Sequence, residues 1–337
     1  MNWPTNTTSS HTIGIGFGTA GLGDRCYAVV TEALAQGFRK FDTAEASYWY
    51  DQRATGQALK DFFVPRGNCS DLRVSTKIPP WSLTSEYDIR KHAADSRQEM
   101  VGFCPHVLMR EADGSELILP YPLDVYYIHA PRCWPGWHPE CNHAPETLNL
   151  YDSWLAMEAI VGLDRTAHRI GLSNVHPPEL RELIEWIQQR QNKYQEIGSD
   201  NYLDDDGRPI APPRLPDVLQ SYADPIEPAE ELKQLCDEYG IEFVSYSTLG
   251  TQHSMRRGGR NPVLTHPVVE SLSVQYERST AEIVLQWARQ KGMSVIPRSS
   301  KAPHIQELAR LLPESNAPSF ELTTHDMLQM DTIKGSI

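Results

Sequence analysis

The chain has 337 residues, of which 40% are hydrophobic and 22% charged, and its net charge is -13 at neutral pH. That composition is typical of globular proteins, and the length is enough to bury a large core. The negative charge would repel nucleic acid, so we expect no nucleic-acid partner. We also expect a cytoplasmic protein with no membrane span, because no run of about 18 apolar residues occurs and the N-terminal segment is polar.

The cysteines follow no spacing that is typical of a disulfide framework. In a cytoplasmic protein of this size such cysteines are expected to be free thiols. The six are Cys26, Cys69, Cys104, Cys133, Cys141 and Cys236. The N-glycosylation sequons at Asn6 and Asn68 are then interpreted as chance matches. Two of the cysteines stand close to His138 and His143, but their spacing matches no standard zinc site, so we predict no metal.

Short apolar segments alternate with longer amphipathic ones along nearly the whole chain. We expect strands at Ile13–Gly18, Lys40–Asp42, Arg73–Lys77, Asp124–His129, His168–Leu172, Asp217–Gln220, Glu242–Tyr246 and Ser294–Ile296. Helical spacing predicts helices at Tyr27–Gln36, Arg53–Phe62, Glu86–Glu99, Ser153–Val161, Pro178–Arg190, Pro228–Tyr239, Ala281–Lys291 and His304–Leu312. Eight alternating units, without a glycine-rich phosphate-binding turn after the first strand, favour a closed (β/α)8 barrel, the TIM barrel, over an open doubly wound sheet.

Two polar stretches, 101–121 and 192–215, interrupt this alternation and are predicted to be surface insertions of a single barrel domain. The first contains a turn sequence at 111–115 that predicts a hairpin. The aromatic, proline-rich segment 131–145 follows the fourth strand, so we expect it to lie over the mouth of the barrel. Beyond the last predicted helix we expect only a short C-terminal tail.

Polar residues stand at the C-terminal ends of most predicted strands, where a core would favour apolar side chains. They are Asp42, Lys77, His129, Asn174, Gln220, Tyr246 and Arg298. One such residue alone usually caps a strand or meets solvent. Because all strand ends of a barrel converge on one mouth, the whole set indicates a functional site there.

Seven segments of the chain resemble aldo-keto reductases, in the order of that family. These are FDTAEASYWYDQ, RVSTKIPP, DVYYIHAP, HRIGLSN, the strand ending at Gln220, FVSYSTLG and SVIPRSSKAPHIQEL. The resemblance covers most of the chain and implies the barrel fold and the NADPH-dependent reduction of an aldehyde or ketone to an alcohol. It also implies a catalytic tetrad of Asp42, Tyr48, Lys77 and His129.

The chemistry of carbonyl reduction fits these side chains. A tyrosine with a pKa of about 10 is a poor proton source unless a nearby cation, here Lys77, stabilises its phenolate. The buried ammonium group needs a carboxylate such as Asp42. His129 would hold the substrate oxygen within hydrogen-bond reach of the tyrosine. The alternatives are a stabilising ion pair between strands and a core histidine without a catalytic role.

The loop that carries the tyrosine is two residues longer than the family pattern between Asp42 and Gly56. The proton donor could therefore be Tyr48 or Tyr50. We favour Tyr48, because Asp51 then follows it at the spacing where the family carries a glutamate.

The resemblance further implies contacts to NADP(H). The nicotinamide end would meet Gly18, Thr19, Asp42, Ser173, Asn174, Gln220 and Tyr246. The pyrophosphate would meet Ser247 and Leu249. The 2′-phosphate and the adenosine would meet Arg298, Ser299, His304 and Glu307. Arg298 replaces a lysine of the family and preserves its charge. His304, however, replaces an arginine and Leu308 an asparagine. We therefore expect weaker cofactor binding than is usual in the family.

The substrate is expected to be a small-molecule carbonyl compound. Trp49, Trp81, Trp134 and Trp137 all fall in loops after strands, where they could hold a bulky or aromatic biosynthetic intermediate, or simply pack their own loops. Such a role would belong to secondary metabolism, and we expect a monomer or weak homo-oligomer. The alternatives are a cofactor-binding regulatory subunit and a non-redox pathway enzyme that uses the same pocket.

Overall fold

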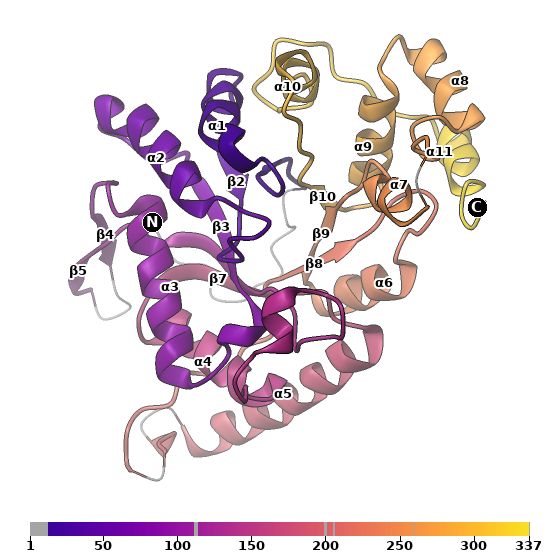
Figure 1. Ribbon diagram of the computed structural model, residues 1–337. Helices are drawn as coiled ribbons and strands as arrows, with labels where there is room; N and C mark the ends of the chain where they lie inside the picture. The colour runs from indigo at the N-terminus through magenta and orange to yellow at the C-terminus, as the bar shows by residue number, and fades with distance from the viewer. Residues whose placement is uncertain (1–12, 111–113, 199–200, 205, 258, 337) are drawn as a thin grey trace.

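A computed structural model describes residues 13–110, 114–198, 201–204, 206–257 and 259–336 (Figure 1). Within these residues, eight parallel strands form one sheet in the order β1-β2-β3-β6-β7-β8-β9-β10. The strands are β1 (Phe17–Gly18), β2 (Lys40–Asp42), β3 (Arg73–Ile78), β6 (Leu123–Ile128), β7 (Ala167–Ser173), β8 (Val218–Tyr222), β9 (Glu242–Tyr246) and β10 (Ser294–Val295). A parallel bridge between Ile15 and Val295 joins the first strand segment to the last. The predicted (β/α)8 barrel is confirmed, although its first and last strands are shorter than expected.

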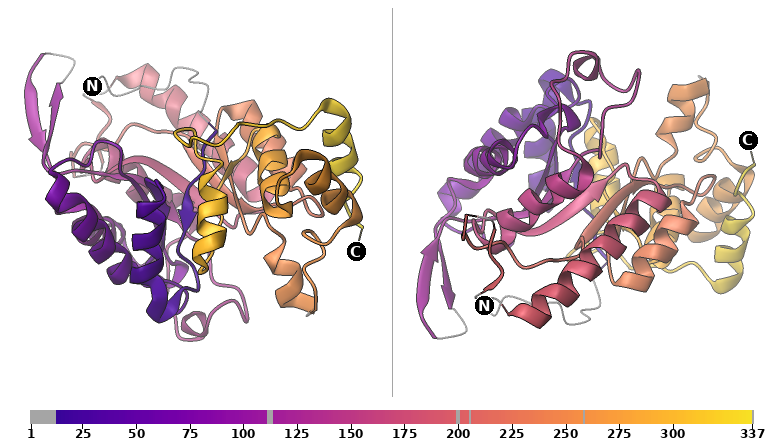
Figure 2. Two further views of the ribbon diagram at one scale, coloured as in Figure 1. Left: turned by 90° about the horizontal axis from the view of Figure 1, so that it is seen from above. Right: turned by 90° about the horizontal axis from the view of Figure 1, so that it is seen from below.

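One long helix follows each strand of the barrel. These helices are α1 (Cys26–Ala35), α2 (Gln52–Phe63), α3 (Glu86–Val101), α4 (Leu150–Gly162), α5 (Pro177–Ile197), α6 (Glu230–Tyr239), α9 (Thr280–Gln290) and α10 (Ala302–Ala309). The sequence analysis missed α7 (Thr251–Arg257), α8 (Pro267–Tyr276) and α11 (Thr324–Asp331). Figures 1 and 2 show α2 and α3 on one side of the barrel and α8, α9 and α11 on the opposite side. Helix α5 continues to Ile197, so the first residues of the predicted insertion 192–215 are helical.

Polar side chains at the helix N-termini explain where several helices begin. The Asp51 side chain accepts a hydrogen bond from the backbone of Ala54 at the start of α2, and Ser85 does the same for α3. Ser279 and Glu282 form a reciprocal capping box at the start of α9. These caps fix the ends of the loops that leave the strands, and therefore the positions of the side chains on those loops.

The barrel interior is filled by side chains from alternating strand positions. Val125, Tyr127, Val218 and Val244 form this inner cluster. Gly171 faces the same space, and a Cβ atom there would lie 2.6 Å from the Tyr127 ring. The larger apolar core lies between the strands and the surrounding helices. The barrel is therefore a closed, packed support for its two ends.

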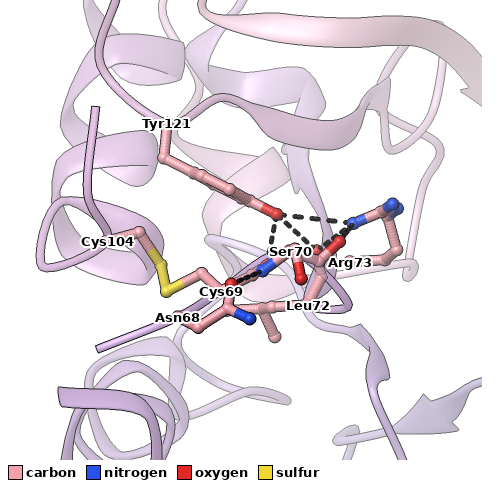
Figure 3. The surroundings of a disulfide bond; sticks show 7 residues. All are labelled: Asn68, Cys69, Ser70, Leu72, Arg73, Cys104 and Tyr121. Carbon is pink, nitrogen blue, oxygen red and sulfur yellow. Dashed lines mark hydrogen bonds between the residues drawn. A yellow bond between two sulfur atoms is a disulfide. The ribbon is translucent and has the colours of Figure 1, made fainter. Parts of the chain in front are cut away.

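An antiparallel hairpin of β4 (Val107–Arg110) and β5 (Glu116–Leu119) projects from the side of the barrel (Figures 1 and 2). A disulfide between Cys69 and Cys104 lies at its base. The Tyr121 hydroxyl donates to the backbone oxygens of Cys69 and Leu72 beside this disulfide (Figure 3). The turn residues 111–113 of the predicted hairpin, and Asn6 of the first sequon, lie outside the described residues.

The prediction that all cysteines are free thiols is wrong. A second disulfide joins Cys133 to Cys141, while Cys26 and Cys236 are free. The first pair is separated by 35 residues and the second by 8, so the pairing depends on the fold and not on a recognisable spacing. In the described part of the chain, none of the helices has the length and apolar composition to cross a membrane.

Candidate active site

A buried ion pair lies at the C-terminal mouth of the barrel. The Lys77 ammonium group on β3 is fully buried and lies 2.5 Å from the Asp42 carboxylate at the end of β2. It also donates to the backbone oxygen of Thr43 at 2.8 Å. Burial lowers the pKa of Lys77, and the charge of Asp42 opposes that effect. The pair matches the lysine and aspartate of the predicted tetrad.

The second oxygen of Asp42 is also bonded. Gln220 on β8 donates to it at 2.8 Å, so the carboxylate links two opposite parts of the barrel wall. The sequence analysis assigned Gln220 to the nicotinamide carboxamide, whereas here its amide nitrogen faces Asp42. Thr19 donates from both its backbone nitrogen and its hydroxyl to the Asp42 backbone oxygen, and Gly18 packs against the backbone oxygen of Ile296. Gly18, Thr19 and Asp42 therefore lie together, as predicted for the nicotinamide end.

His129 follows β6 and is 6% exposed. Its backbone nitrogen donates to Ile78, which fixes it beside β3. Among the residues that the structure describes, none provides a partner for its buried Nδ1 atom. Burial lowers the pKa of His129 well below the usual value, and the charges of Lys77 and His138 lower it further. The imidazole is therefore neutral at physiological pH and offers a hydrogen-bonding atom to a ligand.

The two candidate tyrosines of the β2–α2 loop point in different directions. Tyr48 is 72% exposed, and its ring centroid lies 5.2 Å from that of His138. Tyr50 lies inside the mouth, with its ring centroid 5.3 Å from the Lys77 ammonium nitrogen and 5.8 Å from the His129 ring. Burial raises the pKa of Tyr50, and the charge of Asp42 raises it further. Tyr50, the second of the two candidates, is therefore the loop tyrosine that lies beside Lys77 and His129.

The residues expected around the nicotinamide form a hydrogen-bonded group on β7 and β9. The Tyr246 hydroxyl donates to the Asn174 side-chain oxygen at 2.6 Å. The Asn174 amide nitrogen donates to the Ser173 hydroxyl and to the His129 backbone oxygen. Asn174 and Ser247 both adopt a left-handed backbone conformation directly after their strands. These contacts connect the predicted cofactor residues to the predicted tetrad.

The residues expected around the phosphates are only partly brought together. Arg298 donates to the Gly21 backbone oxygen across the mouth. Burial lowers the pKa of Arg298, and the nearby charge of Arg25 lowers it further. Ser299 accepts from the backbone of Lys301 in the same loop. Arg25 was missed by the sequence analysis, because no strand end or family motif marks it.

The remaining predicted cofactor residues lie farther along their loops. His304 is exposed at the start of α10, and Glu307 accepts a hydrogen bond from Ser279. Leu308 is buried in the core at 2% exposure, so an apolar residue suits that position. Leu249, after β9, is half-buried and its backbone oxygen accepts from Asn261.

An aromatic cluster covers the mouth. Trp137 contacts the rings of Trp49, Trp81 and Trp134, with centroids 5.4 to 6.1 Å apart. His138 stacks on Trp81 at 4.4 Å. The Cys133–Cys141 disulfide closes the loop that supplies three of these rings, and it removes both thiols from the Cys/His cluster considered for zinc. The tryptophans therefore form one surface next to His129, as walls of a pocket for a bulky apolar group would.

The comparisons with known proteins identify the family of the chain. The model of the aldo/keto reductase family matches residues 14–334. A 9,11-endoperoxide prostaglandin H2 reductase of Trypanosoma cruzi is 25% identical over 329 residues, which is 97% of this chain and 89% of the relative. A glycerol 2-dehydrogenase (NADP(+)) of Hypocrea jecorina is 27% identical over 315 residues, which is 91% of this chain and 86% of the relative.

A solved structure supports the fold. The aldose reductase of Schistosoma japonicum superposes with a TM-score of 0.67 at 20% identity, covering 95% of this chain and 88% of that chain. Barrel and mouth together define a (β/α)8 oxidoreductase. The family match spans almost the whole chain, so the protein belongs to the aldo/keto reductase family, and the predicted resemblance is confirmed.

Proposed function

We propose that the protein reduces an aldehyde or ketone to an alcohol with NADPH, and that Tyr50 donates the proton. The observation that carries this proposal is the position of Tyr50 beside the buried Lys77 ammonium group. In the family, one tyrosine and one lysine share this task. The Tyr127 ring also lies 5.8 Å from the Lys77 nitrogen, but Tyr127 belongs to the packed barrel interior, whereas Tyr50 also faces His129. The donor is thus Tyr50 and not the exposed Tyr48.

The four side chains divide the work. Tyr50 holds the proton, because burial keeps its phenol neutral until a substrate oxygen develops negative charge. Lys77 stabilises the phenolate that proton transfer leaves behind. Asp42 keeps Lys77 oriented and offsets the cost of burying its charge. His129, neutral in its buried position, donates a hydrogen bond that holds the carbonyl oxygen.

The mouth fits NADPH, which supplies the hydride when bound. Arg25 and Arg298 carry two positive charges close enough to lower the pKa of Arg298, and an anionic phosphate would relieve their repulsion. For the nicotinamide, Ser173 offers a hydroxyl, Asn174 an amide and Tyr246 an aromatic face. The name of the Hypocrea jecorina relative, which includes NADP(+), supports the same choice.

We propose a bulky or aromatic carbonyl compound as the substrate. The support is the continuous surface of Trp49, Trp81, Trp134 and Trp137 beside His129. A role in secondary metabolism is an extension of this proposal. A cytoplasmic location also stays a prediction, and free thiols no longer support it, since four of the six cysteines are paired.

The test is direct. Purified protein is mixed with NADPH and a panel of aliphatic and aromatic aldehydes and ketones, and the near-ultraviolet absorbance of the reduced nicotinamide is followed. We expect steady oxidation, with higher kcat/KM for the aromatic members. Binding of NADPH without turnover of any carbonyl would replace this proposal by the cofactor-binding subunit, and turnover restricted to small aliphatic members would remove the proposed substrate class.

A further inference from the structure

A buried carboxylate outside the tetrad holds the loop that carries Tyr50. Glu45 lies in the β2–α2 loop, and its side chain is 10% exposed. It accepts hydrogen bonds from the Tyr126 hydroxyl at 2.7 Å, from the Ser96 hydroxyl at 2.7 Å and from Nδ1 of His92 at 2.8 Å. One carboxylate therefore ties the loop to a barrel strand and to helix α3 at once.

The C-terminal end of the same loop is also bonded to the barrel wall and to helix α3. Gln52, the first residue of α2, accepts from the Thr76 hydroxyl on β3. Its amide nitrogen donates to the Ser96 hydroxyl at 3.1 Å and to Glu99 at 2.9 Å. Ser96 thus contacts both Glu45 and Gln52. The two ends of the segment 45–52 are therefore held by the same side chain of α3.

Backbone hydrogen bonds carry this anchoring to Tyr50. The Glu45 nitrogen donates to the Lys77 oxygen at 3.0 Å, which sets the loop against β3. The nitrogens of Trp49 and Tyr50 then both donate to the oxygen of Ala46. This compact turn follows directly after Glu45. A shift of Glu45 would therefore move Tyr50 relative to the Lys77 ammonium group.

One side of this loop borders a cavity instead of packed side chains. The cavity has a volume of about 840 Å³, and its lining includes Glu45, Trp49 and Tyr50 of the loop and His92 and Ser96 of helix α3. Because the cavity removes van der Waals support from that side, the hydrogen bonds of Glu45 and Gln52 supply part of the rigidity of the loop.

We propose that Glu45 is a positioning residue that keeps Tyr50 in place beside Lys77. The inference rests on the proposed function, in which Tyr50 is the proton donor. Misplacing a reacting group by about 1 Å can cost on the order of a hundredfold in rate. Loss of Glu45 should therefore lower turnover with little effect on NADPH affinity, because most of the proposed NADPH contacts lie on β7, β9 and the loop after β10.

The experiment compares Glu45→Ala with Glu45→Gln. 4-Nitrobenzaldehyde serves as the carbonyl probe, and kcat, KM and NADPH affinity are measured for each. We expect Glu45→Ala to lower kcat by about ten- to a hundredfold, with NADPH affinity changed by less than about twofold. Glu45→Gln should restore most of kcat, because its amide oxygen can accept from Tyr126 and Ser96 while its nitrogen donates to neutral His92.

Glu158→Ala is the matched control. Glu158 on α4 is also a buried carboxylate and accepts hydrogen bonds from the Arg190 side chain and the Arg214 backbone nitrogen, but it lies outside the mouth. We expect the folded Glu158→Ala variant to have the same kcat as the unmodified protein. An equal loss of kcat in the control would overturn the positioning role, since both variants would then act by general destabilisation. A changed KM or NADPH affinity with unchanged kcat in Glu45→Ala would overturn it as well.

Two further measurements separate this proposal from the proposed function. Hydrogen exchange of the peptide 43–52 should be at least about tenfold faster in Glu45→Ala and unchanged in Glu158→Ala, and it needs no substrate. If no carbonyl is turned over, the proposed function fails while exchange still tests the anchoring. In a Tyr50→Phe background, Glu45→Ala should cause no additional loss of kcat. Two results would show that Glu45 does not act through Tyr50. One is unchanged hydrogen exchange of the peptide 43–52 in Glu45→Ala, and the other is a further ten- to hundredfold loss of kcat when Glu45→Ala is added to Tyr50→Phe.

Discussion

The two ends of the barrel each hold a cation, fully buried at one end and half-buried at the other, and the two cations have different surroundings. At the mouth, Lys77 has one carboxylate partner, Asp42, and burial lowers its pKa. At the opposite end, Arg169 lies between Asp124 at 2.9 Å and Glu242 at 2.5 Å. Burial opposes the charged form of Arg169, but these two carboxylates outweigh burial and raise its pKa.

The difference indicates that the end with Arg169 contributes to stability and the end with Lys77 to the reaction. The charge of Arg169 is more than neutralised by its carboxylates, so nothing further is needed from a ligand. Lys77 has a single carboxylate partner, which Gln220 also contacts, and its ammonium group faces the Tyr50 ring. An ammonium group without a second carboxylate can stabilise a phenolate that forms beside it during a reaction, which is the property required at the mouth.

The largest effect should follow from removing the cation at the mouth. Lys77→Met keeps the length of the side chain without its charge, so a phenolate at Tyr50 would lose its stabilisation. We expect kcat to fall by at least about a hundredfold, the scale of a lost acid-base group, and the free energy of unfolding to fall as well, because Asp42 is left buried without its cation. Kinetics and a thermal melt of the same preparation check this. A variant that kept normal turnover would remove the contrast between the two ends.

Removing the opposite cation should lower stability without lowering turnover. Arg169→Met leaves Asp124 and Glu242 close together without a partner, which we expect to lower the free energy of unfolding by about 2–4 kcal/mol. Turnover at 20 °C should stay within about twofold of the unmodified protein. Denaturant titration gives the stability. A large loss of kcat in folded protein would mean that this end also serves the reaction.

A smaller effect is expected for the cationic wall of the mouth. Arg298→Ala removes a guanidinium group that would pair with the 2′-phosphate of NADPH. A pair of this kind is worth about 1.5–3 kcal/mol, so NADPH affinity should fall roughly ten- to a hundredfold while NADH affinity hardly changes. Fluorescence titration with both nucleotides checks the prediction. Equal losses for both would place Arg298 away from the 2′-phosphate.

The smallest effect concerns acid stability. Burial holds the pKa of folded His129 well below that of the unfolded chain, which is about 6.5. Below that pH the unfolded chain binds a proton that the folded protein does not, so stability is lost as pH falls, by up to about 1.4 kcal/mol per pH unit. His129→Gln should lose less stability than the unmodified protein between pH 6.5 and 5. Parallel pH dependences in denaturant titrations would rule this out.

Sequence reasoning reached the strand ends because a barrel brings them to one mouth. Asp42, Lys77 and His129 follow short apolar strands, and the spacing of those strands was readable from the chain. The disulfides were not readable, because Cys69 and Cys104 are 35 residues apart in sequence and are brought together only by the packing of helix α3 against β3. Helices α7, α8 and α11 were missed because their apolar patterns are short and interrupted.

The position of Tyr50 shows why a loop is harder to predict than a strand end. Two extra residues had to be accommodated after Asp42, and counting along the sequence cannot say where. In the structure a turn that begins at Ala46 absorbs them, because the nitrogens of Trp49 and Tyr50 both donate to the Ala46 oxygen. That turn directs Tyr48 outward and Tyr50 into the mouth. Gln220 illustrates the same limit, since the sequence could not show that it bonds Asp42.

The central claim, that Tyr50 donates the proton, is tested most directly by two matched variants. Tyr48→Phe and Tyr50→Phe each remove one hydroxyl and leave the ring, and both are assayed with NADPH and 4-nitrobenzaldehyde. We expect Tyr50→Phe to lower kcat by at least about a hundredfold with little change in NADPH affinity, and Tyr48→Phe to change KM at most. Near-normal turnover in Tyr50→Phe together with its loss in Tyr48→Phe would contradict the account and return the role of proton donor to Tyr48.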